Sequence, residues 1–195
     1  MSLTPITNFI GGKFVAATAD KFVDVINPAT KETVTRVPLS TSVDVDTAVI
    51  HGKAAFQTWK DMTMKQRAAI MFTDELCELI VRENGKNFIE AKGDVAKGNE
   101  TVEWSCSLPQ LAAGKFEEVS RGITCTETRE PLGVVGCIVP FNFPCMVPMW
   151  TIPISLVMGN CVIVKPSEKV PRGMQRMAEL LKQAGLPDGV LQIVH

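Results

Sequence analysis

The stretch between residues 133 and 168 decides the fold. It begins GVVGCIV (133–139), continues PFNFP (140–144), runs through apolar residues to GN (159–160) and ends CVIVKPSE (161–168). Two short β-branched runs, each bounded by Gly, Pro or Asn, flank a segment long enough for a helix. Two parallel strands joined by a crossover need this arrangement, so the stretch predicts a βαβ unit.

Polar residues follow both predicted strands. Asn142 comes just after the first strand and Lys165 ends the second. The strands are apolar on both sides, so we expect other elements to cover them on both faces. Ligands of open α/β sheets bind at the carboxyl ends of the strands, and we expect Asn142 and Lys165 to share that rim.

The rest of the second half continues the alternation. A helix is expected from Pro171 to about Gly185, and a final strand over residues 190–194. The second half thus reads β-α-β-α-β, the mononucleotide-binding half of a doubly wound parallel sheet. Within these 195 residues the last strand has no predicted neighbour on one side, so we expect an apolar edge there that favours aggregation.

The first residues predict antiparallel strands. NFIGGKFV (8–15) places Gly-Gly between two apolar runs, and residues 22–26 can pair with residues 33–37 across a turn at residues 27–30. Together these hairpins are expected to form a small antiparallel lobe.

Helical periodicity replaces the strand pattern from Ser42, a candidate N-cap, to Trp59. A second helix is expected to end near Asn84, with an apolar face made of Ala69, Phe72, Leu76, Leu79 and Ile80. A third, less regular helical segment spans residues 86–114 and is interrupted by Gly93, Gly98 and Pro109.

Residues 115–131 return to a strand pattern that is poor in core residues. A two-stranded arm that leaves the domain and pairs with another subunit would suit this sequence. An exposed surface hairpin suits it equally well.

Composition excludes several classes of protein. The 195 residues carry a formal net charge of -1, and the basic residues are scattered, so we expect neither nucleic acid nor an anionic membrane as a partner. The longest apolar stretch, residues 145–158, is shorter than the roughly 20 residues that span a bilayer. No secretion signal or transit peptide is visible, which leaves the compartment open.

The six cysteines form no Cys-x-x-Cys pair and are best explained as reduced thiols in a reducing compartment. With two histidines in the chain, we expect no metal site. Cys145 is the cysteine nearest the expected site, but it lies in an apolar run and is interpreted as helix core.

Two sets of polar residues could carry chemistry. The amide of Asn142 could stabilise an oxyanion on a substrate carbonyl, or it could cap the following helix. Lys165 and Glu168 could clasp the vicinal hydroxyls of a ribose, or they could form an exposed ion pair. A carboxylate beside a 2′-hydroxyl would favour NAD over NADP. The Gly-x-Gly-x-x-Gly and Walker motifs are both absent.

At these residues the chain resembles the aldehyde dehydrogenase superfamily over essentially its whole length. PFNFP (140–144) is similar to the loop before the first crossover helix, and KPSE (165–168) to the ribose-binding motif. Within the superfamily, Phe141 and KVP (169–171) resemble the CoA-acylating methylmalonate-semialdehyde dehydrogenases. GDV (93–95) also fits, although Lys97 stands where that branch would have Arg.

The resemblance implies an α/β fold, namely the N-terminal NAD-binding domain of an aldehyde dehydrogenase. This domain would comprise an antiparallel lobe and helices (1–114), an oligomerisation arm (115–132) and the first βαβαβ half of the NAD-binding sheet (133–195). It implies that Val139 and Phe141 contact the nicotinamide side of NAD, that Lys165 and Glu168 hold its adenosine ribose, with Lys169 beside them, and that Asn142 is one half of the oxyanion hole.

The implied reaction oxidises methylmalonate or malonate semialdehyde with NAD and CoA. A catalytic Cys attacks the aldehyde, hydride passes to NAD, and the thioester is released to CoA after decarboxylation. The matching Cys and catalytic domain would follow residue 195, so we expect this chain to be inactive alone. The alternatives are an inert NAD-binding or subunit-binding fragment, or another branch of the family. A homo-oligomer is expected, in the mitochondrial matrix of a eukaryote or in the cytoplasm of a bacterium.

Overall fold

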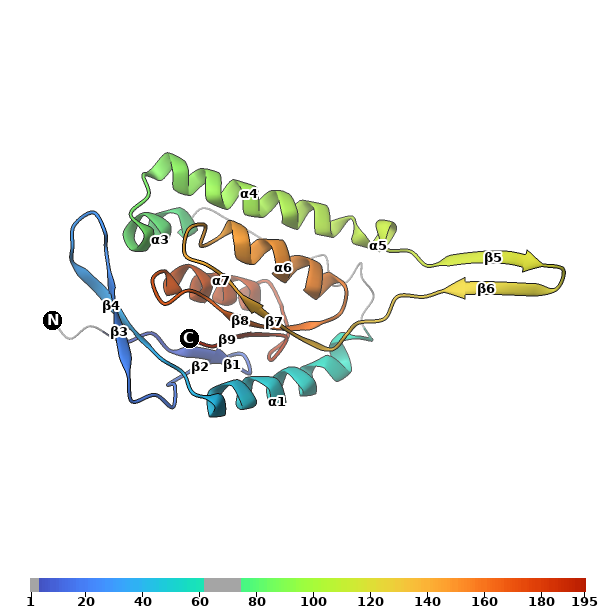
Figure 1. Ribbon diagram of the computed structural model, residues 1–195, viewed down its shortest axis with the longest axis horizontal. Coiled ribbons are helices and arrows are strands. Elements are labelled where there is room, and N and C mark those ends of the chain that lie inside the picture. Colours follow the sequence, from blue (N-terminus) through green and yellow to red (C-terminus); the bar gives the residue numbers. More distant parts are fainter. Residues whose placement is uncertain (1–3, 62–74) are drawn as a thin grey trace.

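The computed structural model describes residues 4–61 and 75–195 (Figure 1). Its centre is a five-stranded sheet of order β2-β1-β9-β8-β7. The parallel part consists of β7 (Val134–Ile138), β8 (Cys161–Lys165) and β9 (Leu191–Ile193), with Val134 opposite Cys161 and Val162 opposite Leu191. The predicted βαβαβ half is therefore confirmed.

Helices cover both faces of this sheet (Figure 1). The crossover helices α6 (Met146–Val157) and α7 (Pro171–Gln183) lie on one face, and α1 (Ser42–Trp59) crosses the other. Helix α4 (Phe88–Cys106) packs outside α6, and α3 (Glu75–Asn84) packs against α4 and α7. One hydrophobic cluster runs through these layers, with Trp59, Met149, Ile152, Met174 and Leu191 almost fully buried.

The last strand is not an unpaired edge, so that prediction is wrong. The hairpin of β1 (Asn8–Ile10) and β2 (Lys13–Val15) joins the central sheet, and β1 pairs antiparallel with β9 through Phe9 and Ile193. The side chains of Phe9 and Ile193 are 4% and 0% exposed. Burial of this apolar surface explains why the hairpin adds to the sheet.

The prediction that both N-terminal hairpins form one antiparallel lobe is wrong, because β1 and β2 belong to the central sheet. The lobe consists of β3 (Phe22–Ile26) and β4 (Thr33–Pro38). These two strands pair with each other in a sheet of their own. Their register shifts at Ile26, next to the turn.

Strand β7 is less covered than expected. It lies at the edge of the described sheet, and Ile138 is 85% exposed, whereas Val162 and Val164 of β8 are fully buried. The apolar pattern of β7 therefore did not guarantee that both of its faces are buried here.

The helices differ from prediction at their ends and interruptions. Thr41, not Ser42, is the N-cap of α1, because the Asp44 carboxylate accepts a hydrogen bond from the Thr41 amide at 2.8 Å. Helix α4 continues through Gly93 and Gly98. A Cβ at Gly98 would lie 3.0 Å from Cγ of Met149, so this glycine allows α4 and α6 to pack closely.

Helix α4 stops before Pro109, which lies in the first turn of the short helix α5 (Leu108–Leu111). The second predicted helix is described from Glu75 onward as α3. The part of its predicted apolar face at Ala69 and Phe72 lies outside the described residues.

A two-stranded arm projects from the body (Figure 1). Within residues 4–61 and 75–195, strands β5 (Lys115–Ser120) and β6 (Ile123–Glu127) pair only with each other, and all of their residues are exposed. The exposed fractions of Phe116 and Ile123 are 72% and 59%. Among the described helices, none is long and apolar enough to cross a bilayer.

Candidate functional site

The carboxyl rim of the parallel strands brings the two predicted motifs together. The chain leaves β7 into residues 139–145 and leaves β8 into residues 166–170, and the Val139 amide donates to the Lys165 carbonyl at 3.1 Å. Both loops therefore start from a fixed point at the same edge of the sheet, as the sequence predicted for Asn142 and Lys165.

A pocket of about 580 Å³ opens beside this rim. Phe141 and Asn142 from the first loop and Glu168, Lys169 and Val170 from the second line one side of it. Val139 and Lys165 do not line this pocket. Val139 is 6% exposed, and Lys165 is the last residue of β8.

Sequence reasoning missed the opposite wall of the pocket. It is formed by the antiparallel lobe and by the end of α3, through the residues Val23, Asp24, Val25, Ile26, Pro28, Glu83 and Asn84. The sequence patterns of these residues, a strand, a turn and a helix end, carry no sign of a shared cavity.

Lys165 and Glu168 form the ion pair that was one of the two predictions. Nζ of Lys165 lies 3.3 Å from the Glu168 carboxylate, and the side chains are 43% and 39% exposed. A backbone hydrogen bond and the nearby Lys165 ammonium lower the pKa of Glu168, so its carboxylate is ionised at neutral pH. Because both groups remain partly exposed, the ion pair can also offer a donor and an acceptor to a ligand.

The second loop also contacts the first through an aromatic ring. Nζ of Lys169 lies 4.3 Å from the centroid of the Phe141 ring, a cation–π contact. The side chain of Phe141 is 46% exposed, so the ring faces the pocket and remains accessible.

Asn142 does not cap the helix that follows it. The amides of Cys145 and Met146 at the start of α6 donate to the carboxylate of Asp94, at 3.3 and 2.7 Å. The second sequence-based alternative for Asn142 is therefore wrong, since a residue of another helix does the capping. Asn142 is exposed and lines the pocket instead.

Two buried cysteines of the βαβ unit are poor nucleophiles, namely Cys145 on the first loop and Cys161 at the amino end of β8, away from the rim. Burial, followed by the Asp94 charge, raises the pKa of the Cys145 thiol to about 12, and burial raises that of Cys161 to about 11. The thiolate is the nucleophilic form, and neither residue forms it appreciably at neutral pH. The interpretation of Cys145 as helix core fits this geometry.

Two buried titratable groups near the rim were not foreseen. Glu83 is 4% exposed, and its carboxylate accepts a hydrogen bond from the backbone amide of Arg172, at the start of α7, with an N–O distance of 2.9 Å. Burial raises its pKa to about 7, although Arg172 lowers it. His195 follows β9 and is 5% exposed, and burial and the Lys165 charge lower its pKa to about 4. One sequence signal could have pointed to His195 as a rim residue. It follows an apolar strand, and Lys165 likewise stands at the carboxyl end of one.

The comparison with known proteins settles the family. The profile described as "Aldehyde dehydrogenase family" matches residues 14–195. The chain belongs to the aldehyde dehydrogenase family. Among family members, malonate-semialdehyde dehydrogenase 1 of Geobacillus kaustophilus is 45% identical over 202 residues, which cover 98% of this chain and 41% of the relative.

Solved family structures agree in fold. The methylmalonate-semialdehyde dehydrogenase of Oceanimonas doudoroffii matches with a TM-score of 0.94 and 39% identity, over 98% of this chain and 41% of that one. A Sinorhizobium meliloti structure assigned to the same enzyme and complexed with NAD also has a TM-score of 0.94, with 37% identity over 99% of this chain and 41% of that one. The chain thus spans about two fifths of the length of these family members.

Proposed function

We propose that this chain is the NAD-binding portion of an enzyme that oxidises malonate or methylmalonate semialdehyde with NAD and transfers the acyl product to CoA. The observation that carries the proposal is the convergence of Asn142, Phe141, Glu168 and Lys169 on one pocket at the carboxyl rim of the sheet. The names of the relatives support the choice of substrate.

The residues present fit a dinucleotide with a free ribose 2′-hydroxyl. The ionised and half-exposed Glu168 can accept hydrogen bonds from vicinal hydroxyls, and Lys165, whose Nζ lies 3.3 Å from that carboxylate, can donate to the same group. The same carboxylate would repel a 2′-phosphate, which favours NAD. NAD would supply the hydride acceptor when bound.

The first loop would serve the reacting end of the substrate. Val139 and Phe141 would contact the nicotinamide side, and the exposed Asn142 amide would donate to the oxygen of the aldehyde as negative charge develops on it. A donor of this kind is typically worth about 10²- to 10³-fold in rate. Lys169 would hold the Phe141 ring in place through the cation–π contact.

We propose further that the nucleophilic Cys is supplied by residues outside this chain, so that these 195 residues do not turn over aldehyde alone. The raised pKa of Cys145, the cysteine on the first loop, supports this. The β5–β6 arm would pair with another subunit in a homo-oligomer. The compartment would be the cytoplasm of a bacterium or the mitochondrial matrix of a eukaryote.

Two measurements on the purified chain test the proposal. The first is calorimetric titration with NAD, using Glu168→Gln as the site variant. Glu179→Gln is a matched control, since Glu179 is also 39% exposed and pairs with a basic residue at the same spacing. We expect binding that Glu168→Gln weakens and Glu179→Gln does not.

The second measurement follows the near-ultraviolet absorbance of NADH in the presence of malonate semialdehyde, NAD and CoA. We expect none to form. CoA-dependent NADH formation would mean that a cysteine of this chain is the nucleophile, and would overturn that part of the proposal. Absence of NAD binding would overturn the assignment of the pocket and would favour the alternative of a subunit-binding fragment.

A further inference from the structure

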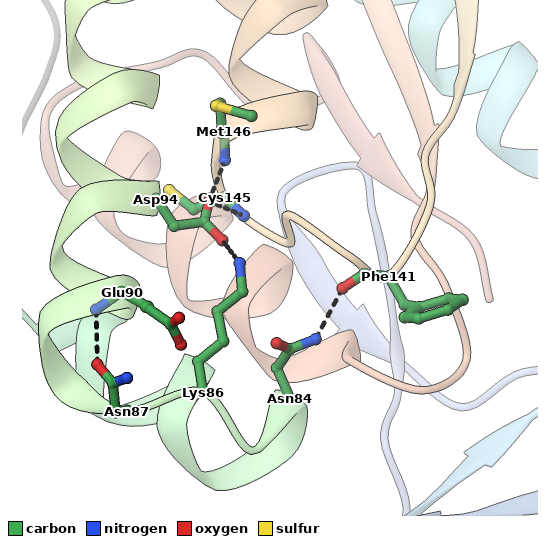
Figure 2. A network of polar contacts seen from close by, with 8 residues as sticks. All are labelled: Asn84, Lys86, Asn87, Glu90, Asp94, Phe141, Cys145 and Met146. Atoms are coloured by element: carbon green, nitrogen blue, oxygen red, sulfur yellow. Dashed lines mark hydrogen bonds and ion pairs between the residues drawn. The ribbon is translucent and has the colours of Figure 1, made fainter.

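Helix α6 begins without a capping side chain of its own. Its N-cap is Cys145, which makes no side-chain cap hydrogen bond. The cap comes from Asp94 of α4, 51 residues earlier in the chain, whose Oδ1 accepts from the amides of Cys145 and Met146 (Figure 2). A carboxylate at this position satisfies free N–H groups and interacts favourably with the helix dipole.

The other oxygen of Asp94 is also occupied. Oδ2 accepts from Nζ of Lys86 at 2.9 Å, and Asp94 is 3% exposed while the Lys86 side chain is 15% exposed. The Lys86 ammonium in turn lies 4.2 Å from the centroid of the Phe143 ring. A buried carboxylate therefore joins the start of α6 to the connector between α3 and α4.

The last residue of α3 holds the loop at an earlier point. Nδ2 of Asn84 donates to the Phe141 carbonyl at 2.9 Å, as Figure 2 shows. Asn84 thus contacts Phe141, Lys86 contacts Phe143, and Asp94 contacts Cys145 and Met146. We call Asn84, Lys86 and Asp94 the α3–α4 clamp. Asn142 lies between the clamped residues and has Pro140 and Pro144 on either side.

We infer that Asp94 is a positioning residue for the cofactor and substrate site. Through the cap of α6 it fixes residues 140–146 in the conformation that presents Phe141 and Asn142 to the pocket. Asp94 itself does not line this pocket and acts through the loop. The inference rests on the proposed function, because it assigns the loop to the nicotinamide side of NAD.

The structure separates this role from general stability. The α3–α4 clamp contacts residues 141, 143, 145 and 146, whereas the adenosine side of the proposed site is formed by Lys165 at the end of β8 and Glu168 on the loop that follows. Loss of the clamp should therefore weaken ligands that reach the first loop and spare ligands that occupy only the second. A purely structural defect would weaken both.

The test compares Asp94→Ala, Asp94→Asn and Ser105→Ala in the 195-residue chain. Ser105 is a matched control, since it is a buried polar residue of the same helix whose hydroxyl donates within α4, to the Val102 carbonyl. Affinities for NAD and for AMP are measured by titration calorimetry, and amide exchange of residues 140–147 and 161–165 by mass spectrometry.

Asp94→Ala is expected to reduce NAD affinity by about tenfold, the scale of lost charge-assisted hydrogen bonds, and to change AMP affinity by less than about twofold. Asp94→Asn keeps one acceptor oxygen and should lose less. Amide exchange should accelerate in residues 140–147 and not in residues 161–165, and Ser105→Ala should change neither quantity selectively.

Equal losses of NAD and AMP affinity, or unchanged exchange of residues 140–147 in Asp94→Ala, would overturn the inference. The exchange measurement decides this even if the wild-type chain binds neither ligand, a result that would count against the proposed function alone.

Discussion

The Lys169 ammonium lies 4.3 Å from the centre of the Phe141 ring and thereby joins the two loops that follow β7 and β8. One loop carries Asn142 and the other carries Glu168, so this contact links the two loops that line one side of the pocket. Cation–π contacts at partly exposed sites are worth about 0.5–1 kcal/mol, which is enough to bias a loop but not to hold a fold.

Substitution of Lys169 should therefore affect binding more than stability. Lys169→Met keeps the length of the side chain and removes the charge, and we expect it to weaken NAD binding by about two- to fivefold, given the strength of such contacts. Lys169→Arg should preserve affinity, because a planar guanidinium also stacks on aromatic rings. Titration calorimetry measures both, and thermal melting should be nearly unchanged. A large drop in melting temperature for Lys169→Met would contradict this role.

Glu168 should decide between the two dinucleotides. The Glu168→Gln change removes the charge that repels a 2′-phosphate and keeps an acceptor oxygen, so the ratio of NAD to NADP affinity should fall, by about tenfold or more. Lys165 remains to attract the phosphate. Competition titrations with the two dinucleotides measure the ratio, and an unchanged ratio would mean that the Lys165–Glu168 pair does not contact the ribose.

The rim of this site could be predicted because its signals are local. Gly, Pro and Asn mark the ends of the strands within residues 133–168, and parallel pairing then places Asn142 and Lys165 at one edge. The pairing of Phe9 with Ile193 could not be predicted in this way, since the two residues are far apart in the chain and only burial in the folded core selects the contact.

The capping role of Asp94 shows the same limit. On the sequence, Asp94 is a polar residue within a helix, and the start of α6 has a Cys where a capping residue would be expected. The cap exists because Gly98 lets α4 approach α6 closely, which is a property of the packed pair of helices. The opposite wall of the pocket, with Glu83 and Asn84, depends likewise on tertiary packing.

Glu83 should make the protein less stable as the pH rises. Burial raises its pKa in the folded protein to about 7, above the ordinary 4.5, so between these values the folded state binds more protons than the unfolded state. The unfolding free energy attributable to Glu83 therefore falls from pH 4.5 to about 7, by an amount on the order of a few kcal/mol.

Denaturant titrations of wild type and Glu83→Gln across this range test the prediction. The amide keeps an acceptor for the Arg172 amide and does not ionise, so the stability of the variant relative to wild type should increase with pH. Glu78→Gln on the same helix serves as the exposed control. A constant difference between Glu83→Gln and wild type would show that Glu83 does not titrate in this window.

His195 should act in the opposite direction over an overlapping range. Its folded-state pKa is lowered to about 4 from 6.5 by burial and by Lys165, so between these values the unfolded state binds more protons. The His195 contribution to stability is thus present above pH 6.5 and is lost as the pH falls towards 4. His195→Gln should remove this acid sensitivity, and His51→Gln, at an exposed position, should not. Equal acid sensitivity of His195→Gln and wild type would contradict the prediction.

The arm should govern assembly without affecting the pocket. An isolated two-stranded hairpin is marginally stable in water, and β5–β6 exposes Phe116, Val119 and Ile123, so a partner that buries these side chains would stabilise it. Ile123→Lys should therefore shift the chain to a smaller assembly in light scattering, with NAD affinity unchanged.

Ile89→Lys is the control. Ile89 is 83% exposed on α4, outside the arm, so its substitution should leave the assembly unchanged. A wild-type chain that is already a monomer at the concentrations used would show that the arm is a surface hairpin, the second of the two structures that its sequence allows.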